Sequence, residues 1–279
     1  MSYSDLNLCT KTHTTSKIKT ESDLLSLSSL GFRGEALSSI DTVSKLEIKS
    51  TRDGKEAWHL ALNKLNPTSL AKGTIVQVSQ LFENFPARKQ FLKRQASETS
   101  QCKQIFIEKA LPWPTLEFRL SIDGNINYVL PQAESFLDRS LACLKPTEPA
   151  SFFYTITNSG PFFSYTIVLG SPDVRKKDRR FQYIFINGRR IIDYSLLQAI
   201  AYGSEGFFPN GAQAFCLVFL TIDPSQIDIN IHPAKKEVRF KDSTTIHHAI
   251  SSSIKNFYHN YTVASITNNI PQTSSFTEN

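Results

Sequence analysis

The sequence predicts an α+β protein built from two domains. Its 279 residues exceed the usual length of one domain and are enough for two. Hydrophobic residues make up 40% of the chain and charged residues 20%, values that are typical of folded proteins and exclude wholesale disorder. Runs with the period of a strand are mixed irregularly with runs of helical period, which favours α+β over a repeat architecture.

The first half is predicted to open with a helix, a loop and a second helix. Residues 5–11 are helix-like, and the Ser/Thr-rich stretch 12–29 indicates a loop. Apolar residues recur at helical spacing in residues 35–43, which predicts the second helix. Alternation of apolar and polar residues then predicts three strands, at 45–51, 57–65 and 74–80.

Two basic helices and a hairpin complete this half. Residues 87–95 and 98–111 combine cations with apolar residues at helical spacing. The segments 116–122 and 126–130 alternate like strands, and Asp123-Gly124 stands between them. Because this dipeptide accepts the positive φ angles of a two-residue turn, the sequence predicts a β-hairpin here.

The second half is predicted to form a β-α-β core. Prolines 146 and 149 oppose both helix and central strand, and they lie close to the start of this half. The predicted strands are 152–157, 162–169, 181–186 and 214–222, with a helix at 194–202 before the last of them. Ile246, Ile250 and Ile254 share one face of a closing helix, and a polar stretch from residue 263 is typical of a linker.

Charge and cysteine content narrow the classes of function. The formal net charge of +6 is compatible with a polyanionic partner or with solubility alone. The four cysteines form no C-x-x-C pair, which argues against a zinc knuckle or a redox dithiol and predicts reduced, packed thiols. No metal site is predicted, since His247 and His248 point about 100° apart on a helix. The chain has no signal-like N-terminus and no long apolar run, so we expect a cytoplasmic protein with no membrane partner.

The most informative local string is LGFRGEAL at residues 30–37. Gly31 and Gly34 bracket Arg33 and lead into the helix predicted at 35–43. Glycines let backbone N–H groups approach an anion, and a helix N-terminus carries partial positive charge, so the string suits a phosphate. The same spacing also fits an ordinary junction between a loop and a helix, and the residues alone leave both interpretations open.

Five strings together resemble the MutL family of DNA mismatch-repair ATPases, which belongs to the GHKL superfamily. The first three are TTSKI at residues 14–18, GFRGEAL at 31–37 and GTIVQV at 73–78, the last followed by LFENFPARK at 81–89. The other two are FINGRR at 185–190 and IDINIHPAKKEVRF at 227–240. The resemblance covers residues 1–260 and implies a partial GHKL (Bergerat-type) α/β sandwich followed by a ribosomal S5-like β-α-β domain.

The resemblance implies ATP with Mg²⁺ as the cofactor. In the family, ATP lies between a sheet and a mobile lid, and a lysine from the second domain reaches the γ-phosphate. The cofactor-binding residues that it implies here are Thr15, Ser16, Lys17, Gly31, Phe32, Arg33, Gly34, Thr74 and Lys235.

Other family features are missing from the sequence. The family carries a Glu general base and an Asn magnesium ligand on a helix, followed by a DNGxGM turn, and neither string occurs in this chain. We therefore expect a truncated chain with weak or no ATPase activity and impaired nucleotide binding, because hydrolysis needs a positioned base and a metal. The predicted domains are a partial ATPase domain at 1–133, an S5-like transducer and DNA-binding domain at 134–262, and a linker stub at 263–279.

The implied function is that of an ATP-switched DNA-binding matchmaker that couples mismatch detection to repair. The implied partners are double- and single-stranded DNA, the mismatch-recognition protein MutS, a downstream nuclease or helicase, and a second copy of the chain. A noncatalytic, S5-like nucleic-acid-binding module is the alternative. The candidate DNA-binding residues are Arg175, Lys176, Lys177, Arg179, Arg180 and Arg189.

Overall fold

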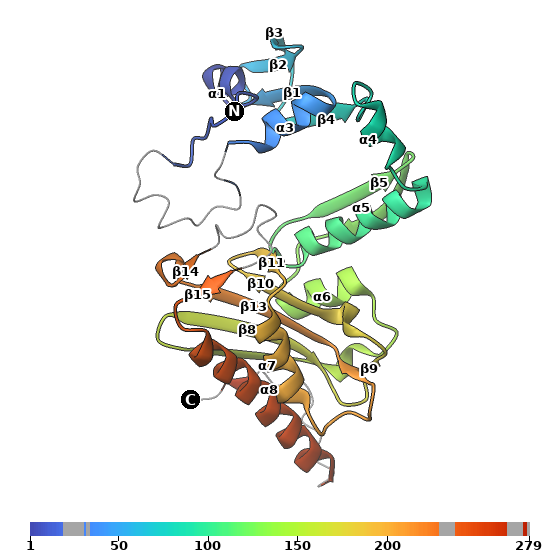
Figure 1. Ribbon diagram of the computed structural model, residues 1–279, viewed down its shortest axis with the longest axis vertical. Coiled ribbons are helices and arrows are strands. Elements are labelled where there is room, and N and C mark those ends of the chain that lie inside the picture. The colour runs from blue at the N-terminus through green and yellow to red at the C-terminus, as the bar shows by residue number, and fades with distance from the viewer. Residues whose placement is uncertain (19–30, 32–33, 229–237, 267–275, 278–279) are drawn as a thin grey trace. The chain divides into compact units, whose positions relative to one another are not determined.

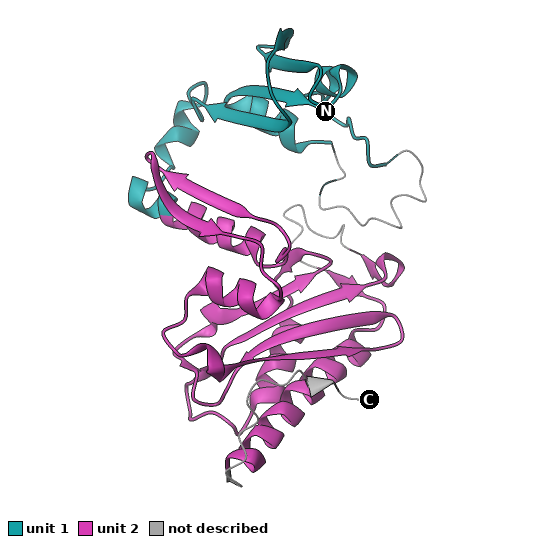
Figure 2. Ribbon diagram, turned by 180° about the vertical axis from the view of Figure 1, so that it is seen from behind, with its two compact units in different colours: residues 1–99 teal, residues 100–279 magenta. Residues whose placement is uncertain are grey.

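The computed structural model describes residues 1–18, 31, 34–228, 238–266 and 276–277. The chain divides into two compact units, residues 1–99 and residues 100–279, coloured separately in Figure 2. This division falls inside one helix and precedes the domain boundary expected at 133/134. The functional division into domains at 134 and 263 stays a prediction.

Unit 1 is built on a four-stranded sheet with the order β3-β2-β1-β4, in which all neighbours are antiparallel. Its strands are β1 (Lys45–Thr51), β2 (Ala57–Ala61), β3 (Lys64–Thr68) and β4 (Gly73–Ser79). Its helices are α1 (Tyr3–Leu8), α3 (Ala36–Val43) and α4 (Pro86–Gln90). The core is small, because its buried apolar side chains are Leu6, Leu46, Ile48 and Leu60.

The prediction of a single strand at residues 57–65 is wrong, because the chain turns back at Leu62-Asn63 and forms β2 and β3 instead. Both residues have positive φ, 49° and 58°, as a two-residue hairpin turn requires. The third strand that results contains Pro67, which is compatible with an edge position because proline has no N–H to donate. Alternation runs on through this turn, so periodicity by itself could not locate it.

Strand β4 leaves apolar side chains exposed at the edge of unit 1. Ile75, Val76 and Val78 are each about half exposed. Val76 and Val78 are paired with the buried residues Ile48 and Leu46 of β1, so they extend the core face of the sheet beyond the part that the helices cover.

Unit 2 contains a six-stranded sheet with the order β11-β10-β13-β8-β7-β16. These strands are β7 (Phe153–Ser159), β8 (Phe163–Gly170), β10 (Gln182–Ile186), β11 (Arg189–Ile191), β13 (Cys216–Ile222) and β16 (Phe276–Thr277). Three further pairs join β5 (Phe118–Ile122) to β6 (Asn125–Leu130), β9 (Arg175–Lys176) to β12 (Gln213–Ala214), and β14 (Ile227–Asp228) to β15 (Arg239–Phe240). The turn predicted at Asp123-Gly124 is confirmed, with φ angles of 50° and 78°.

The helices of unit 2 lie on both faces of this sheet (Figure 1). They are α5 (Gln95–Ala110), whose first residues belong to unit 1, α6 (Phe136–Leu144), α7 (Tyr194–Ser204) and α8 (Ser243–Ile266). Short 3-10 turns occur at η1 (Ala150–Phe152), η2 (Arg179–Phe181) and η3 (Pro224–Gln226). No described helix combines the length and the apolar character that crossing a membrane requires.

Strand β13 separates two hydrophobic cores. Val218 and Leu220 face the core under α7 and α8, whereas Leu217 and Phe219 face the core under α6. Strands β10 and β13 are parallel, and α7 lies between them in the chain, which confirms the predicted β-α-β arrangement.

Helix α6 was not expected from periodicity, yet its start has a local signal. The Ser135 hydroxyl accepts a hydrogen bond of 3.1 Å from the backbone N–H of Asp138, which caps the helix. An acidic residue three positions after a serine favours a helix start, and this pair could have revealed α6.

Truncation of a core side chain in the sheet should destabilise unit 2. Ile184 is fully buried, so we expect Ile184→Ala to lower the free energy of unfolding by about 2–5 kcal/mol through the cavity it leaves. Urea denaturation followed by Trp113 fluorescence in a Trp58→Phe background measures this. Ile126→Ala is the control, since Ile126 is 66% exposed, and an equal loss in both variants would contradict the assigned core.

Candidate nucleotide site and basic surface

The turn at Gly34 lies directly against the backbone of Thr14. Gly34 has a φ of +64°, and a Cβ atom added to it would lie 2.4 Å from the Thr14 carbonyl oxygen and 2.7 Å from the Thr14 nitrogen. Real Cβ atoms do not approach backbone so closely, so this contact requires glycine. Two of the strings that resemble the family, TTSKI at residues 14–18 and GFRGEAL at residues 31–37, therefore meet at Thr14 and Gly34.

Further contacts join these two segments. The Lys17 ammonium lies 3.9 Å from the position that a Cβ on Gly31 would occupy. His13 Nδ1 lies 3.5 Å from Glu35 Oε1, an exposed contact that contributes little to stability. The Lys17 backbone N–H donates to the Thr15 hydroxyl at 3.2 Å, which shapes the segment that carries Ser16 and Lys17, both exposed. A cation and two hydroxyl side chains thus lie beside a glycine turn that leads into α3.

Thr74 lies on β4 of the unit 1 sheet, whereas the segments that carry Thr14 and Gly34 lie outside the strands. Its hydroxyl forms a hydrogen bond of 2.7 Å with the hydroxyl of Ser50, its partner across β1 and β4. Ser50 is buried, and its Oγ also accepts a hydrogen bond of 2.6 Å from the Met1 amino group. We did not expect Ser50 to be involved. The sequence held a signal for this role, because the alternation of Leu46 and Ile48 predicts a buried apolar residue at position 50, where the chain has a serine.

Three candidate residues of the nucleotide site, Phe32, Arg33 and Lys235, lie outside the described residues. The described residues fit the phosphate end of a nucleotide, because the Gly34 turn has no side chain and Lys17 lies close to Gly31. Within the described ranges, no three His, Cys, Asp or Glu side chains group in a way that could hold a metal ion.

The basic segment of unit 2 contains both exposed and buried cations. Arg175, Lys177, Arg179 and Arg180 are exposed on β9, η2 and the residues between them. Arg180 Nε lies 2.8 Å from a carboxylate oxygen of Asp178. The backbone N–H of Arg180, followed by its side chain, donates to that carboxylate and lowers the Asp178 pKa.

Two candidate cations, Lys176 and Arg189, are buried. The Lys176 ammonium donates to both carboxylate oxygens of Glu148, at 2.7 and 2.8 Å, and lies 4.9 Å from the centroid of the Phe181 ring. Burial alone would raise the Glu148 pKa, but the hydrogen bonds from Lys176 and nearby donors outweigh it, so the pKa lies below its ordinary value. Arg189 is 8% exposed, and burial lowers the pKa of its guanidinium. Neither side chain presents its charge to solvent as Arg179 does.

The cysteines follow the expected packing with one exception. Cys143 and Cys216 are buried, and burial raises the pKa of Cys143 to about 11, which keeps its thiol protonated and unreactive. Cys9 is half-buried. Cys102 is exposed on α5, so the expectation that all four thiols are packed is wrong for this residue, whose polar neighbours in the helix face solvent.

Comparison with known families gives a match inside unit 2. The family model described as "DNA mismatch repair protein, C-terminal domain" matches residues 148–259. This range begins after α6 and ends within α8, so it contains the β-α-β core.

Similar curated proteins extend the match to almost the whole chain. The DNA mismatch repair protein MutL of Treponema pallidum is 44% identical, over 95% of this chain and 46% of the relative. MutL of Borreliella afzelii is 35% identical, over 92% of this chain and 43% of the relative. The chain thus spans less than half the length of these relatives.

Solved structures confirm the predicted fold class. The N-terminal domain of a DNA repair protein matches with a TM-score of 0.74 and 22% identity, over 95% of this chain and 84% of that one. The Aquifex aeolicus MutL ATPase domain complexed with ADP matches with a TM-score of 0.51 and 25% identity, over 67% of this chain and 70% of that one. The fold is α+β and of the GHKL type, with an S5-like second part.

Placing a methyl group at Gly34 should separate the two segments of unit 1. We expect Gly34→Ala to increase hydrogen exchange in residues 11–18, because the new Cβ cannot coexist with the Thr14 backbone at 2.4 Å. Gly73→Ala is the matched control, since Gly73 also has positive φ, 102°, but its Cβ would meet nothing within 4 Å. Hydrogen exchange read by mass spectrometry checks this, and equal exchange in the two variants would contradict the contact.

Proposed function

Because the chain belongs to the MutL family of DNA mismatch repair proteins, we propose that it acts as an ATP-switched, DNA-binding matchmaker that couples mismatch detection to repair. The chain covers less than half the length of its curated relatives and is similar in fold to the N-terminal domain of a DNA repair protein. The proposed activity is therefore that of a whole protein to which these residues contribute one part. The observation that carries the proposal is the contact between the Gly34 turn and Thr14, which joins the two ATP-site strings of unit 1.

The described residues would hold the phosphates of a nucleotide. Backbone N–H groups at Gly31 and Gly34 can approach phosphate oxygens closely, and the start of α3 adds partial positive charge. Lys17 would add a cation, and Thr15 and Ser16 would add hydroxyl donors. The similar MutL ATPase domain from Aquifex aeolicus is complexed with ADP, which supports a nucleotide as the occupant.

The remaining assignments extend this site. Thr74, held by Ser50, would lie near the base. Phe32 and Arg33 would complete the phosphate turn, and Lys235 would reach the γ-phosphate. Mg²⁺ is part of the proposed cofactor, and when bound the ion offsets the charge of the phosphates. A contact made only with the triphosphate would let the protein respond to the nucleotide state by differential binding.

DNA contact is proposed for the exposed part of the basic segment. Arg175, Lys177 and Arg179 can meet phosphates from exposed positions. Arg180 is also exposed but would first have to leave Asp178, and Lys176 and Arg189 would first have to leave buried positions. A cluster of exposed cations supports sequence-independent binding that weakens as salt increases. The proposed partners of these exposed cations are both double- and single-stranded DNA.

The proposed partners follow the family. They are the mismatch-recognition protein MutS, a downstream nuclease or helicase, and a second copy of the chain. Cytoplasmic location belongs to the same proposal, because the similar curated proteins are bacterial and bacterial DNA lies in the cytoplasm. The alternative, a noncatalytic nucleic-acid-binding module, is favoured by the family match that falls entirely inside unit 2.

Loss of the cation beside the glycine turn should weaken nucleotide binding. We expect Lys17→Ala to reduce ATP affinity about tenfold, because a charge-assisted contact to phosphate is lost. Isothermal titration with ATP and Mg²⁺ measures this. Lys11→Ala is the control, because Lys11 is an exposed lysine six residues earlier that we do not place in the site. Unchanged affinity in Lys17→Ala would remove Lys17 from the site.

Charge reversal in the basic segment should weaken duplex binding. The double variant Arg179→Glu with Arg180→Glu should bind a 20-bp duplex about tenfold more weakly at low salt, with a shallower salt dependence. Fluorescence anisotropy checks both effects. The control pairs Lys241→Glu with Lys255→Glu, which changes the net charge equally at exposed lysines outside the segment. Equal losses would mean that overall charge, not this segment, determines binding.

A further inference from the structure

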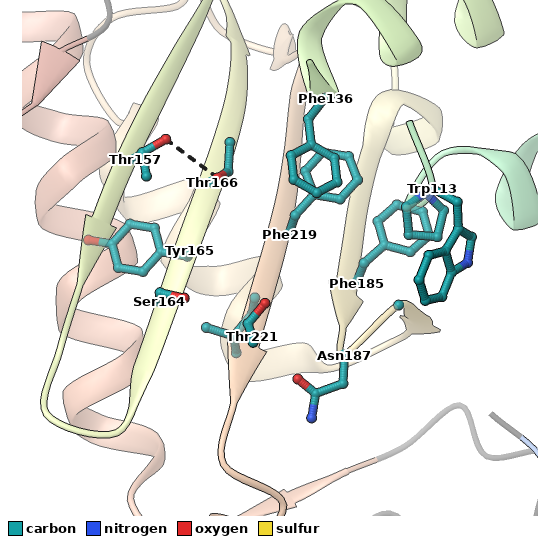
Figure 3. Close-up of a pocket in the computed structure, with 13 residues that line it drawn as sticks. Trp113, Phe136, Thr157, Ser164, Tyr165, Thr166, Phe185, Asn187, Phe219 and Thr221 are labelled. Atoms are coloured by element: carbon teal, nitrogen blue, oxygen red, sulfur yellow. Dashed lines mark hydrogen bonds between the residues drawn. The ribbon is translucent and has the colours of Figure 1, made fainter. Parts of the chain in front are cut away.

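A pocket opens on the face of the six-stranded sheet that α6 covers in part. Its volume is about 290 Å³, close to the lower end of the range for small-molecule sites, about 300–1,000 Å³. All its lining residues lie between 112 and 221, so the pocket belongs to unit 2 alone. Figure 3 shows aromatic rings along one side and hydroxyl-bearing strand residues along the other.

The hydroxyl side is formed by four short side chains on three neighbouring strands. Thr157 of β7, Ser164 and Thr166 of β8, and Thr221 of β13 line the pocket. Thr157, Ser164 and Thr221 are exposed, and the hydroxyls of Thr157 and Thr166 lie 3.4 Å apart. Each hydroxyl can donate one hydrogen bond and accept two, so this shelf offers several donors and acceptors to a bound molecule.

The aromatic side is closely packed. Phe219 stacks between Phe136, at a centroid distance of 4.2 Å, and Phe185, at 5.2 Å. The Trp113 indole packs against Gly188, where an added Cβ would lie 2.6 Å from its ring, yet the residue is 37% exposed. Half-buried Phe136 and exposed Trp113 therefore present ring surface at the pocket, held in place by the packing behind them.

The lining favours a flat, neutral molecule with polar edges. None of the described residues that line the pocket is charged, so a phosphate or a charged side chain would enter without a counter-charge. An apolar side chain from a protein partner would cover the hydroxyl shelf and leave its groups without hydrogen-bond partners. A nucleobase meets both requirements, because its faces stack on aromatic rings and its edges carry donors and acceptors.

We infer that this pocket holds an unstacked base of single-stranded DNA, an inference that rests on the DNA-binding function proposed above. A base inside a duplex has its edge paired and its faces stacked, so it cannot enter. Phosphates of the same strand would stay outside, where the positive net charge of the chain favours them. The pocket thus gives unit 2 a means to distinguish single strands from duplex, separate from the exposed arginines.

The first test uses the tryptophan of the pocket as a probe. The chain has two tryptophans, so a Trp58→Phe background leaves Trp113 as the fluorophore. Single-stranded dT20 should quench Trp113 fluorescence, because a base stacks near the indole, and a 20-bp duplex should not. Free thymidine, added in place of dT20, tests whether the pocket takes an isolated base. Quenching by thymidine at micromolar concentration would overturn the assignment to a DNA strand.

The second test blocks or alters the pocket. Ser164→Phe fills it from an exposed position and should weaken dT20 binding about tenfold in anisotropy measurements, with Ser151→Phe as an exposed control outside the pocket. The pair Thr157→Val with Thr166→Val removes two hydroxyls at almost constant volume and should weaken binding about fivefold. Thr155→Val is its control on the same side of β7.

The outcomes separate this inference from the function on which it rests. Weaker dT20 binding in both pocket variants, with unchanged duplex binding and unchanged thermal unfolding, supports the inference. The inference is overturned if Ser164→Phe binds dT20 as tightly as the unmodified chain, or if it weakens the binding of dT20 and of duplex equally. In either case, duplex binding that depends on Arg179 and Arg180 leaves the proposed function standing. No binding of either DNA by the unmodified chain would overturn both.

Discussion

The burial of β13 on both faces is the constraint on which unit 2 depends. Its residues Cys216–Ile222 are all buried except Thr221, and they pair parallel with β10 and antiparallel with β8. A strand of this kind must be apolar on both sides, and its neighbours are held in one register by the two cores that it separates. The six-stranded sheet around β13 positions both the basic segment and the pocket. Thr221 marks the point at which one core ends and the hydroxyl shelf begins.

Unit 1 is organised by close backbone approach more than by a large core. Leu6, Leu46, Ile48 and Leu60 form a small cluster, and β4 leaves half-exposed apolar side chains at its edge. The candidate nucleotide site relies on Gly34, where the Thr14 backbone occupies the space of a side chain. A site made from backbone groups suits a phosphate, because N–H donors in fixed positions need no side-chain ordering when the anion binds.

Local chemistry explains which elements the sequence could predict. The alternation at 45–51 marks β1 with its observed bounds, and Asp123-Gly124 marks a hairpin turn, since both depend on neighbouring residues. The turn at Leu62-Asn63 was missed because leucine is an unusual residue at positive φ, and pairing across β2 and β3 holds it there. Helix α6 was missed although Leu137, Leu141 and Leu144 recur at helical spacing and Ser135 caps its start, so both local signals were present in the sequence.

The sequence by itself determined the family resemblance, the α+β class and the residue types of the candidate nucleotide site and the proposed DNA-binding segment, because these are carried by contiguous strings. The tertiary structure decided which of those residues are exposed and which of them lie together. It brought Gly34 against Thr14, buried Lys176 beside Glu148, left Arg179 exposed, and assembled a pocket from strands and aromatic rings that no single motif contains. Exposure and proximity depend on contacts between residues far apart in the chain, and local spacing holds no record of those contacts.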